Sequence, residues 1–217
     1  MDGAIVKSGV KRQLVIATGN MGKAKEFQRL LKDFPIEIKG LGDFGPIPEV
    51  EEDGDTFEEN AVKKARFTAR VLGLPALADD SGLMVDALDR RPGVYSARYA
   101  GENAGDLKNN RKLLAEMEGV EDRRASFMCV IAIAVPRGPA LIYEGKCEGV
   151  IANEMKGEGG FGYDPLFYYP SMKKTFAQMT PDEKNSVSHR GRAMNELKDE
   201  FNKVMIWLSQ RLREEPF

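Results

Sequence analysis

Ala78-Asp79-Asp80-Ser81-Gly82-Leu83 is the segment that decides how the middle of this chain folds. Its two adjacent carboxylates follow an apolar stretch, residues 74–78, and precede Ser-Gly. On a strand, neighbouring side chains point to opposite sides, so at most one of the two aspartates points easily into a given cleft. Carboxylates at a strand end are good Mg²⁺ ligands or general bases. The alternative is a strand-to-turn junction, because Asp, Ser and Gly are also turn residues.

Apolar runs and helical stripes alternate on both sides of this segment. Strands are expected at residues 14–17, 36–41, 76–78, 83–88, 127–135 and 140–151. The last two are expected to pair as an antiparallel hairpin around the turn at 136–139. Helices are expected at residues 23–31, 57–72, 106–117 and 188–212. This alternation predicts an α/β fold with a mixed sheet.

Capping signals mark the starts of two helices. Asp55 and Glu58 have a spacing like that of a capping box at the start of the 57–72 helix, and Gly73 marks its end. The run Thr180-Pro181-Asp182-Glu183 combines a capping box with proline at the first helical position. A loop rich in Gly, Pro and acidic residues, 42–54, precedes the first of these two helices.

Length and composition are those of a globular protein with ample chain for a core. The 217 residues carry a formal net charge of −2, which argues against bulk nucleic-acid binding through net charge. No apolar stretch is long enough to span a membrane and no signal-peptide core is present, so a cytoplasmic protein is expected. Cys129 and Cys147 are expected to be reduced, and a single His argues against a closed zinc site. Residues 1–12 are interpreted as a polar extension and 13–217 as one domain.

The run Thr18-Gly19-Asn20-Met21-Gly22-Lys23 lies between the first expected strand and the first expected helix. Such a turn can direct backbone N–H groups and a helix N-terminus at phosphate, and Lys23 adds a positive charge. It is not a Walker A loop, because the glycines are too close and Ala24 stands where Ser or Thr is required. An ordinary glycine-containing turn explains these residues equally well.

Acidic residues crowd the loop that follows the second expected strand. They are Glu49, Glu51, Glu52, Asp53 and Asp55. A solvated surface explains most members of such a run. One of these carboxylates could still share a metal with Asp80, because a Mg²⁺ site needs only one or two protein carboxylates when phosphate and water supply the other ligands.

A glycine-rich segment at residues 157–165 is hard to explain as a regular element, because so many glycines cost conformational entropy. The glycines suit backbone that closely approaches a ligand, and Phe161 or Tyr163 could offer a ring face to a base. Asp164 could accept a hydrogen bond from a base N–H or from ribose. The alternative is a flexible hairpin end whose aromatic side chains pack inward.

Lys184 and the run Ser188-His189-Arg190 form a further cluster near the start of the last expected helix. Lys184 suits a phosphate, whereas His189 and Arg190 can donate to a carbonyl oxygen on a base. A purely structural histidine is equally consistent with the local sequence. A Ser-His-Asp hydrolase is the weaker alternative, because the chain has no Gly-x-Ser-x-Gly elbow and no spacing that aligns a serine with His189.

In combination, these segments resemble the Ham1-like family of inosine triphosphate pyrophosphatases, also described as dITP/XTP pyrophosphatases. The matching blocks are ordered, cover nearly the whole chain beyond residue 12, and several are long. They comprise residues 17–23, 56–61, 78–83, 92–101, 159–165 and 188–190.

The resemblance implies a homodimeric, Mg²⁺-dependent enzyme in which an elongated mixed sheet and its helices form two lobes around a central cleft. The implied reaction is hydrolysis of the non-canonical purine nucleoside triphosphates ITP, dITP and XTP to the monophosphate and pyrophosphate. The family's proton acceptor and one metal ligand map onto Asp80. A second acidic ligand falls within the loop at residues 49–52, where Glu51 is the choice. The family's substrate-binding positions map onto Thr18, Gly19, Asn20, Met21, Gly22, Lys23, Ser81, Phe161, Gly162, Tyr163, Asp164, Lys184, His189 and Arg190.

The expected mechanism is attack of water on the α-phosphorus, with Asp80 as metal ligand or base and Asp79 assisting. Base choice is expected to rest on the 6-oxo group of hypoxanthine and xanthine, to which His189 and Arg190 can donate. Two alternatives stay open: a Maf-like pyrophosphatase with another base preference, and a non-catalytic nucleotide-binding module. The products released from a panel of nucleotides distinguish the three.

Overall fold

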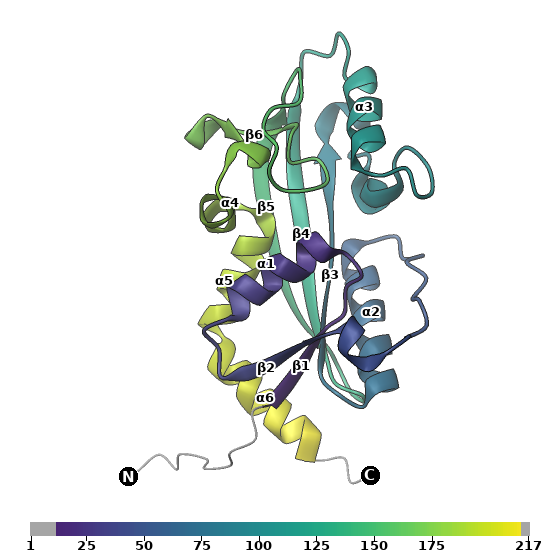
Figure 1. Cartoon of the computed structure of the whole chain (residues 1–217), viewed down its shortest axis with the longest axis vertical. Coiled ribbons are helices and arrows are strands. Elements are labelled where there is room, and N and C mark those ends of the chain that lie inside the picture. Colours follow the sequence, from purple (N-terminus) through teal and green to yellow (C-terminus); the bar gives the residue numbers. More distant parts are fainter. Residues whose placement is uncertain (1–11, 214–217) are drawn as a thin grey trace.

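One mixed sheet organises the computed structural model, which describes residues 12–213 (Figure 1). Within these residues seven strands follow the order β2-β1-β3-β4-β5-β6-β7. β1 pairs in parallel with β2 and with β3, and the later pairs are antiparallel. The predicted α/β fold with a mixed sheet is therefore confirmed. The interpretation of residues 1–12 as an extension lies outside the described residues, except that β1 already begins at Arg12.

The bounds of the elements agree closely with most of the expected ranges. The strands are β1 (Arg12–Ile16), β2 (Ile36–Gly40), β3 (Ala76–Val85), β4 (Arg124–Ala134), β5 (Leu141–Ile151), β6 (Phe167–Tyr169) and β7 (Lys174–Thr175). The α-helices are α1 (Met21–Leu31), α2 (Phe57–Leu72), α3 (Asp106–Glu116), α4 (Pro181–Val187), α5 (His189–Asp199) and α6 (Phe201–Arg213). The 3₁₀ helices are η1 (Leu41–Phe44), η2 (Asp86–Leu88), η3 (Gly93–Arg98), η4 (Pro170–Met172) and η5 (Phe176–Gln178).

β3 corrects the expectation of two short strands separated by a turn. The ladder with β4 runs without interruption through Asp79, Asp80 and Ser81, so both carboxylates lie in the middle of a strand and not at its end. Gly82 serves a close approach there instead of a turn, because a Cβ at this position would lie 2.3 Å from the carbonyl oxygen of Gly93. The small residue therefore lets η3 pack directly on the strand.

One capping prediction is wrong by one residue and one expected helix is divided in two, whereas the capping box at Thr180 and Glu183 is confirmed. The N-cap of α2 is Thr56, whose hydroxyl accepts from the backbone N–H of Glu59, and the side chain of Glu59 completes the capping box. The sequence interpretation had used Asp55 and Glu58, one residue earlier. The expected helix at 188–212 is two helices, because α5 ends at Asp199 and α6 begins at Phe201.

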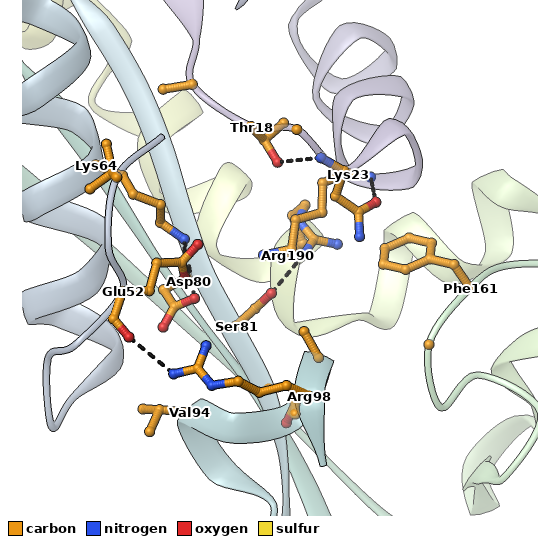
Figure 2. Close-up of a pocket in the computed structure, with 18 of the residues that line it drawn as sticks. Thr18, Lys23, Glu52, Lys64, Asp80, Ser81, Val94, Arg98, Phe161 and Arg190 are labelled. Atoms are coloured by element: carbon orange, nitrogen blue, oxygen red, sulfur yellow. Dashed lines mark hydrogen bonds and ion pairs between the residues drawn. The ribbon is translucent and has the colours of Figure 1, made fainter. Parts of the chain in front are cut away.

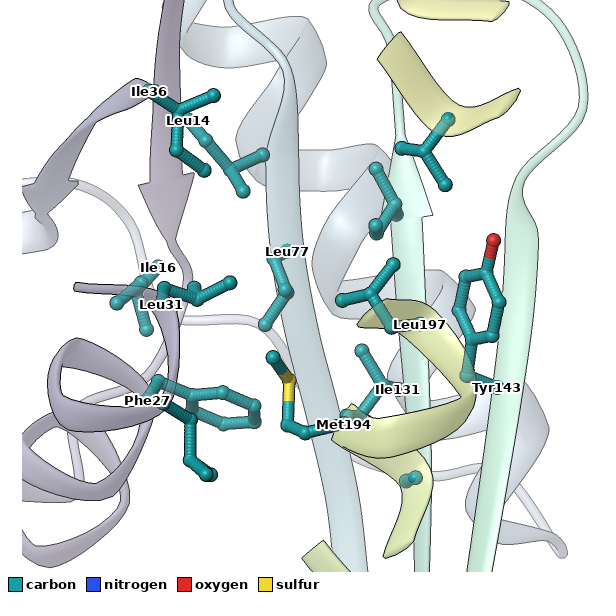
Figure 3. Close-up of a cluster of buried hydrophobic side chains, with 14 of the residues drawn as sticks. Leu14, Ile16, Phe27, Leu31, Ile36, Leu77, Ile131, Tyr143, Met194 and Leu197 are labelled. Atoms are coloured by element: carbon teal, nitrogen blue, oxygen red, sulfur yellow. The ribbon is translucent and has the colours of Figure 1, made fainter. Parts of the chain in front are cut away.

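Helices α1, α5 and α6 cover one face of the sheet. Phe27 of α1 and Met194 of α5 pack there against Leu77 of β3 and Ile131 of β4 (Figure 3). Side chains alternate along a strand, so Asp79 lies on the same face of the sheet as Leu77. This face is therefore the one that Asp79 shares with α1 and α5.

Helix α2 covers the opposite face through small side chains. Ala61, Ala65 and Ala69 follow one another at intervals of four residues and are buried against alanines of β3 and β4, including Ala78. Small side chains allow the helix and the sheet to approach closely, so polar groups on the same side of α2 can reach β3. Asp80 lies on this face, because its side chain alternates with that of Asp79.

A third hydrophobic cluster occupies the far part of the long strands. Leu83 of β3 and Phe127 of β4 pack there with Leu113 of α3 and Phe167 of β6. Figure 1 shows α3 and β6 at the opposite end of the molecule from α6. The separate clusters thus form two lobes that share β3, β4 and β5. Among the described helices, none is both long and apolar enough to span a membrane.

Candidate active site

A cleft of about 590 Å³ lies over the middle of β3, between the two lobes (Figure 2). Its walls come from the turn before α1, the acidic loop (residues 45–56), α2, η3, the glycine-rich segment (residues 157–165), α4 and α5. It gathers most of the predicted site residues. Those that line it are Thr18, Gly19, Asn20, Lys23, Asp80, Ser81, Phe161, Gly162, Tyr163, Asp164, Lys184, His189 and Arg190.

Three predicted site residues are not part of this lining. The side chain of Met21 is 69 % exposed. Gly22 has another role, because a Cβ added to it would lie 2.6 Å from the ring of Phe161. The glycine lets that ring pack over the start of α1 and so brings the glycine-rich segment next to the predicted phosphate turn. Glu51 is exposed, whereas its neighbour Glu52 does line the cleft.

Asp79 is the centre of a buried cluster of charges and not a cleft residue. Its Oδ2 atom lies 3.0 Å from Lys23 Nζ and 3.0 Å from Arg190 Nη2, and it accepts a hydrogen bond from Ser81 Oγ at 3.1 Å. Burial alone would raise the pKa of Asp79, but Lys23 and Arg190 outweigh it and hold this pKa far below the ordinary value. Asp79 is therefore a permanent counter-charge for two cations.

The cations of the cleft continue this cluster as a chain of alternating charges. Arg190 also donates to Glu26, and Lys184 Nζ lies 2.8 Å from Glu26 Oε1 and 2.6 Å from Asp164 Oδ2. The side chain of Arg190 is 1 % exposed, so these partners offset a large desolvation cost. Lys184 and Arg190 thus reach the cleft already paired, which fixes the positions of their remaining donors.

Asp80 faces the other side of β3 and meets α2. Lys64 Nζ donates to Asp80 Oδ1 at 3.2 Å and to Glu52 Oε2 at 2.9 Å, so one cation bridges the two carboxylates. Asn60 Nδ2 donates to Asp80 Oδ2 at 3.3 Å. Burial raises the pKa of Asp80, and the negative charges of Glu52 and Asp79 add to this effect against the opposing influence of Lys64 and Lys23.

The carboxylates of Glu52 and Asp80 are the pair that best fits a hard metal ion. Both are oxygen ligands, and their common hold on Lys64 Nζ shows that they converge on one cation. Within residues 12–213 no group of three or more His, Cys, Asp and Glu side chains is arranged around a metal position. Two carboxylates are nevertheless enough for Mg²⁺ when phosphate and water complete the shell. The geometry therefore favours Glu52 over Glu51 as the partner of Asp80.

In the turn before α1, backbone N–H groups that were expected to point at a phosphate donate instead to side chains of the turn. Asn20 is the N-cap of α1, and its Oδ1 atom accepts from the N–H groups of Gly22 at 2.9 Å and Lys23 at 3.1 Å. The hydroxyl of Thr18 accepts from the N–H of Asn20. These donors are thus already engaged, so a phosphate at this turn would meet the side chain of Lys23 and the positive end of the α1 dipole.

The glycine-rich segment is held in one shape from two sides. Asp106 and Asn110 at the start of α3 clamp Gly162: the carboxylate accepts from its N–H at 2.6 Å, and the amide donates to its carbonyl at 2.7 Å. Asp164 accepts from the N–H of Phe161 at 2.9 Å. The ring of Phe161 lies against Lys184 Nζ, 4.6 Å from the ring centroid. Phe161 also lines the cleft, which is what a stacking surface for a base requires.

Tyr163 and His189 are both buried in the wall of the cleft. The hydroxyl of Tyr163 donates to the carbonyl of Ser96 at 2.9 Å, which uses the polar end of that side chain. His189 stacks on Phe127 with ring centroids 4.6 Å apart, and its Nδ1 atom has no hydrogen-bond partner among the described residues. Burial, together with the charge of Arg190, lowers the pKa of His189 well below its usual value. A neutral imidazole, with one donor and one acceptor, therefore faces the cleft.

A pH dependence of stability follows from His189, the single histidine of the chain. The unfolded chain binds a proton near pH 6.5 but the folded chain does not, so stability is fully present above pH 6.5 and falls as the pH drops below it. Between pH 7.5 and 5.5, we expect the native chain to lose about 1 kcal/mol more unfolding free energy than the His189→Gln variant. Urea unfolding at both pH values measures this difference, and equal losses would show that His189 is protonated in the folded state.

Comparison with known proteins gives this geometry a family. The model of the Ham1 family matches residues 14–200, which is most of the chain. The chain belongs to the Ham1 family. Membership confirms the resemblance seen in the sequence blocks, and the matched range contains every residue of the cleft described above.

Relatives within the Ham1 family cover the chain almost end to end. The dITP/XTP pyrophosphatase of Syntrophobacter fumaroxidans is 62 % identical over 93 % of this chain and 87 % of its own length. That of Desulfotalea psychrophila is 60 % identical over 93 % and 91 %. Among solved structures, a HAM1 protein from Coxiella burnetii is 46 % identical, with a TM-score of 0.81 over 88 % of this chain and 99 % of its own.

Several residues that line this Ham1-family cleft, or that hold the side chains lining it, were given no role by the sequence interpretation. Asn60, Lys64 and Thr68 follow one another at intervals of four on the alanine-rich face of α2, and this polar row on a buried face was a readable signal. Glu26 gave no signal, because a glutamate three residues after Lys23 is typical of a solvated helix face. Arg98 belongs to the matching block at residues 92–101, in which the sequence interpretation named no site residue.

Proposed function

We propose that this Ham1-family chain hydrolyses non-canonical purine nucleoside triphosphates, namely dITP, XTP and ITP, to the monophosphate and pyrophosphate. The activity after which its relatives are named, dITP/XTP pyrophosphatase, supports this proposal. The observation that carries it is the meeting of Glu52 and Asp80 on one cation, Lys64, in a cleft that also presents Lys23. Converging carboxylates and nearby cations are what the hydrolysis of a phosphoanhydride needs.

Mg²⁺ is the cofactor we propose for this site, with Glu52 and Asp80 as its protein ligands. When bound, it offsets negative charge on the phosphate oxygens and on the leaving pyrophosphate. Asn60 fixes one oxygen of Asp80 by a hydrogen bond at 3.3 Å. The amide therefore keeps the carboxylate turned toward the cleft.

In the proposed reaction, a water oxygen forms a bond to the α-phosphorus while the bond to the bridging oxygen of the β-phosphate breaks. Asp80 orients the water and accepts its proton, and pyrophosphate leaves with the electron pair of the broken bond. Lys23 and Lys64 carry positive charge next to the path of the phosphates. Burial lowers the pKa of Lys64, but Asp80, Asp79 and Glu52 together raise it above its ordinary value, so it stays charged.

For base selection we propose His189 and Arg190, with Phe161 as the stacking surface. His189 lines the cleft and is neutral, so a base there would meet an imidazole and not an imidazolium. Arg190 is oriented by Glu26 and Asp79. A donor aimed at a 6-oxo group is left unpaired by the 6-amino group of adenine, which penalises ATP.

A nucleotide panel with Mg²⁺ tests the proposed function. We expect pyrophosphate from dITP, XTP and ITP, with kcat/KM at least about 100-fold above that for ATP, since an unpaired buried polar group gives strong discrimination. Pyrophosphate and orthophosphate are measured separately, so that simple phosphatase activity is recognised. Equal turnover of ATP and ITP would refute base selection, and pyrophosphate only from a pyrimidine nucleotide would favour a Maf-like activity instead.

We further propose that residues 13–217 act as one catalytic domain and that two copies form a homodimer in the cytoplasm. Tyr95 on η3 and Leu107 on α3 support a dimer, because these large apolar side chains are 56 % and 53 % exposed on elements that contact each other. Light scattering after size exclusion measures the assembly directly. A monomer at micromolar concentration would refute the dimer without affecting the proposed reaction.

A further inference from the structure

Arg98 connects the two walls of the cleft. It is the last residue of η3, which packs on β3 at Gly82, and its Nη2 atom donates to the carbonyl oxygen of Glu52 at 3.0 Å (Figure 2). Glu52 belongs to the acidic loop, which has no helix or strand of its own between residues 45 and 56. A side chain of η3 therefore holds the main chain of an irregular segment.

Both the side chain and the main chain of Glu52 are thus held by hydrogen bonds. Lys64 of α2 holds the carboxylate at 2.9 Å, while Arg98 holds the carbonyl oxygen of the same residue. On the far side of Glu52, Asn60 ties the loop to α2 by accepting from the N–H of Gly54 at 2.8 Å. The hydrogen bond from Arg98 therefore ties the loop to the lobe opposite α2, at the residue whose carboxylate is proposed to bind the metal.

We propose that Arg98 is a positioning residue that keeps the carboxylate of Glu52 within reach of the cation shared with Asp80. The proposal rests on the proposed function, since it concerns the same carboxylate pair. A guanidinium suits this task because its planar donors stay charged and hold a fixed direction. Groups that orient a metal ligand typically change metal affinity or activity by about 10- to 100-fold when they are removed.

The other contacts of Arg98 are weaker candidates for its role. Its Nε atom is 3.8 Å from Glu102, a side chain that is 82 % exposed, and its guanidinium lies 5.2 Å from the ring centroid of Tyr95. Exposed pairs of this kind contribute little. Because Arg98 also lines the cleft, direct binding of a substrate phosphate is the alternative that the experiment must separate.

The first measurement is the Mg²⁺ dependence of dITP hydrolysis in Arg98→Met, which keeps an unbranched apolar stem. We expect the Mg²⁺ concentration at half-maximal rate to rise about 10- to 100-fold, with an unchanged nucleotide KM at saturating Mg²⁺. Glu102→Gln is the matched control and should behave like the native chain. A raised nucleotide KM with an unchanged Mg²⁺ requirement would overturn the proposal in favour of direct substrate binding.

The second measurement does not depend on activity. Hydrogen exchange of the amides of residues 45–53, without nucleotide or metal, should be faster in Arg98→Met than in the native chain and in Glu102→Gln. Unchanged exchange in this loop would overturn the tether. If the native chain released no pyrophosphate from dITP, the proposed function would fail, while the exchange of the loop would still decide whether Arg98 holds it.

Discussion

Asp80→Asn is expected to lower the turnover of dITP by about 10³-fold while the chain stays folded. The variant keeps the size and hydrogen-bonding shape of the side chain, but it removes the negative charge that converges with Glu52 on Lys64 Nζ. A neutral amide is a poor metal ligand and cannot accept a proton from water. Pyrophosphate release with saturating Mg²⁺ measures the loss.

The stability of Asp80→Asn gives the internal control for this result. Burial raises the pKa of Asp80, so the folded state disfavours its charge, and a neutral replacement removes that cost. Without added metal we expect its unfolding free energy to stay within about 1 kcal/mol of the native value. A stable variant with near-native turnover would show that Asp80 is not the central group of the reaction.

The sequence predicted the opposite directions of Asp79 and Asp80 but not the shape of the chain around them. Alternation along a strand is local, and it follows from the backbone whatever the partner is. Ser81 and Gly82 are typical of turns, and only the packing of η3 against β3 shows that Gly82 is needed for space within a continuous strand. The cause is the carbonyl oxygen of Gly93 in η3, which packs on the strand, and no local sequence pattern reveals that contact.

The site residues were predictable where they lie together in one short stretch of sequence. They were less predictable where the path of a loop, or a partner distant in sequence, determines which side chain enters the site. The acidic loop has no periodicity, so the choice between Glu51 and Glu52 depends on the path of the backbone past α2. Lys184 and Arg190 were expected to face substrate. That both pair with Glu26 depends on α1, α4 and α5 meeting in space.

Fold-determining contacts and the proposed chemistry are divided between neighbouring residues of β3. On one face, the charges of Asp79, Lys23 and Arg190 hold α1 and α5 on the sheet. On the other face, Asp80 meets α2 and the acidic loop. The same substitution should therefore reduce mainly the stability at Asp79 and mainly the turnover at Asp80. Comparing the two variants tests this division more strictly than either variant alone.

Asp79→Asn is expected to lower the unfolding free energy by about 3–5 kcal/mol, because it leaves Lys23 and Arg190 buried without their common counter-charge. The folded state strongly favours the charged form of Asp79: although burial would raise its pKa, the two cations hold this pKa far below the ordinary value. Urea unfolding at pH 7.5 measures the loss. The urea midpoint should fall much further for Asp79→Asn than for Asp80→Asn.

Asp182→Asn supplies the matched control for this prediction. Asp182 also pairs with an arginine, Arg29, at 2.9 Å, but its side chain is 88 % exposed, so water and salt screen the pair. Its loss should leave the midpoint almost unchanged, which separates the effect of burial from that of removing an aspartate. If Asp79→Asn were as stable as this control, the charges around Asp79 would not be what holds α1 and α5 to the sheet, and the division of roles along β3 would have to be abandoned.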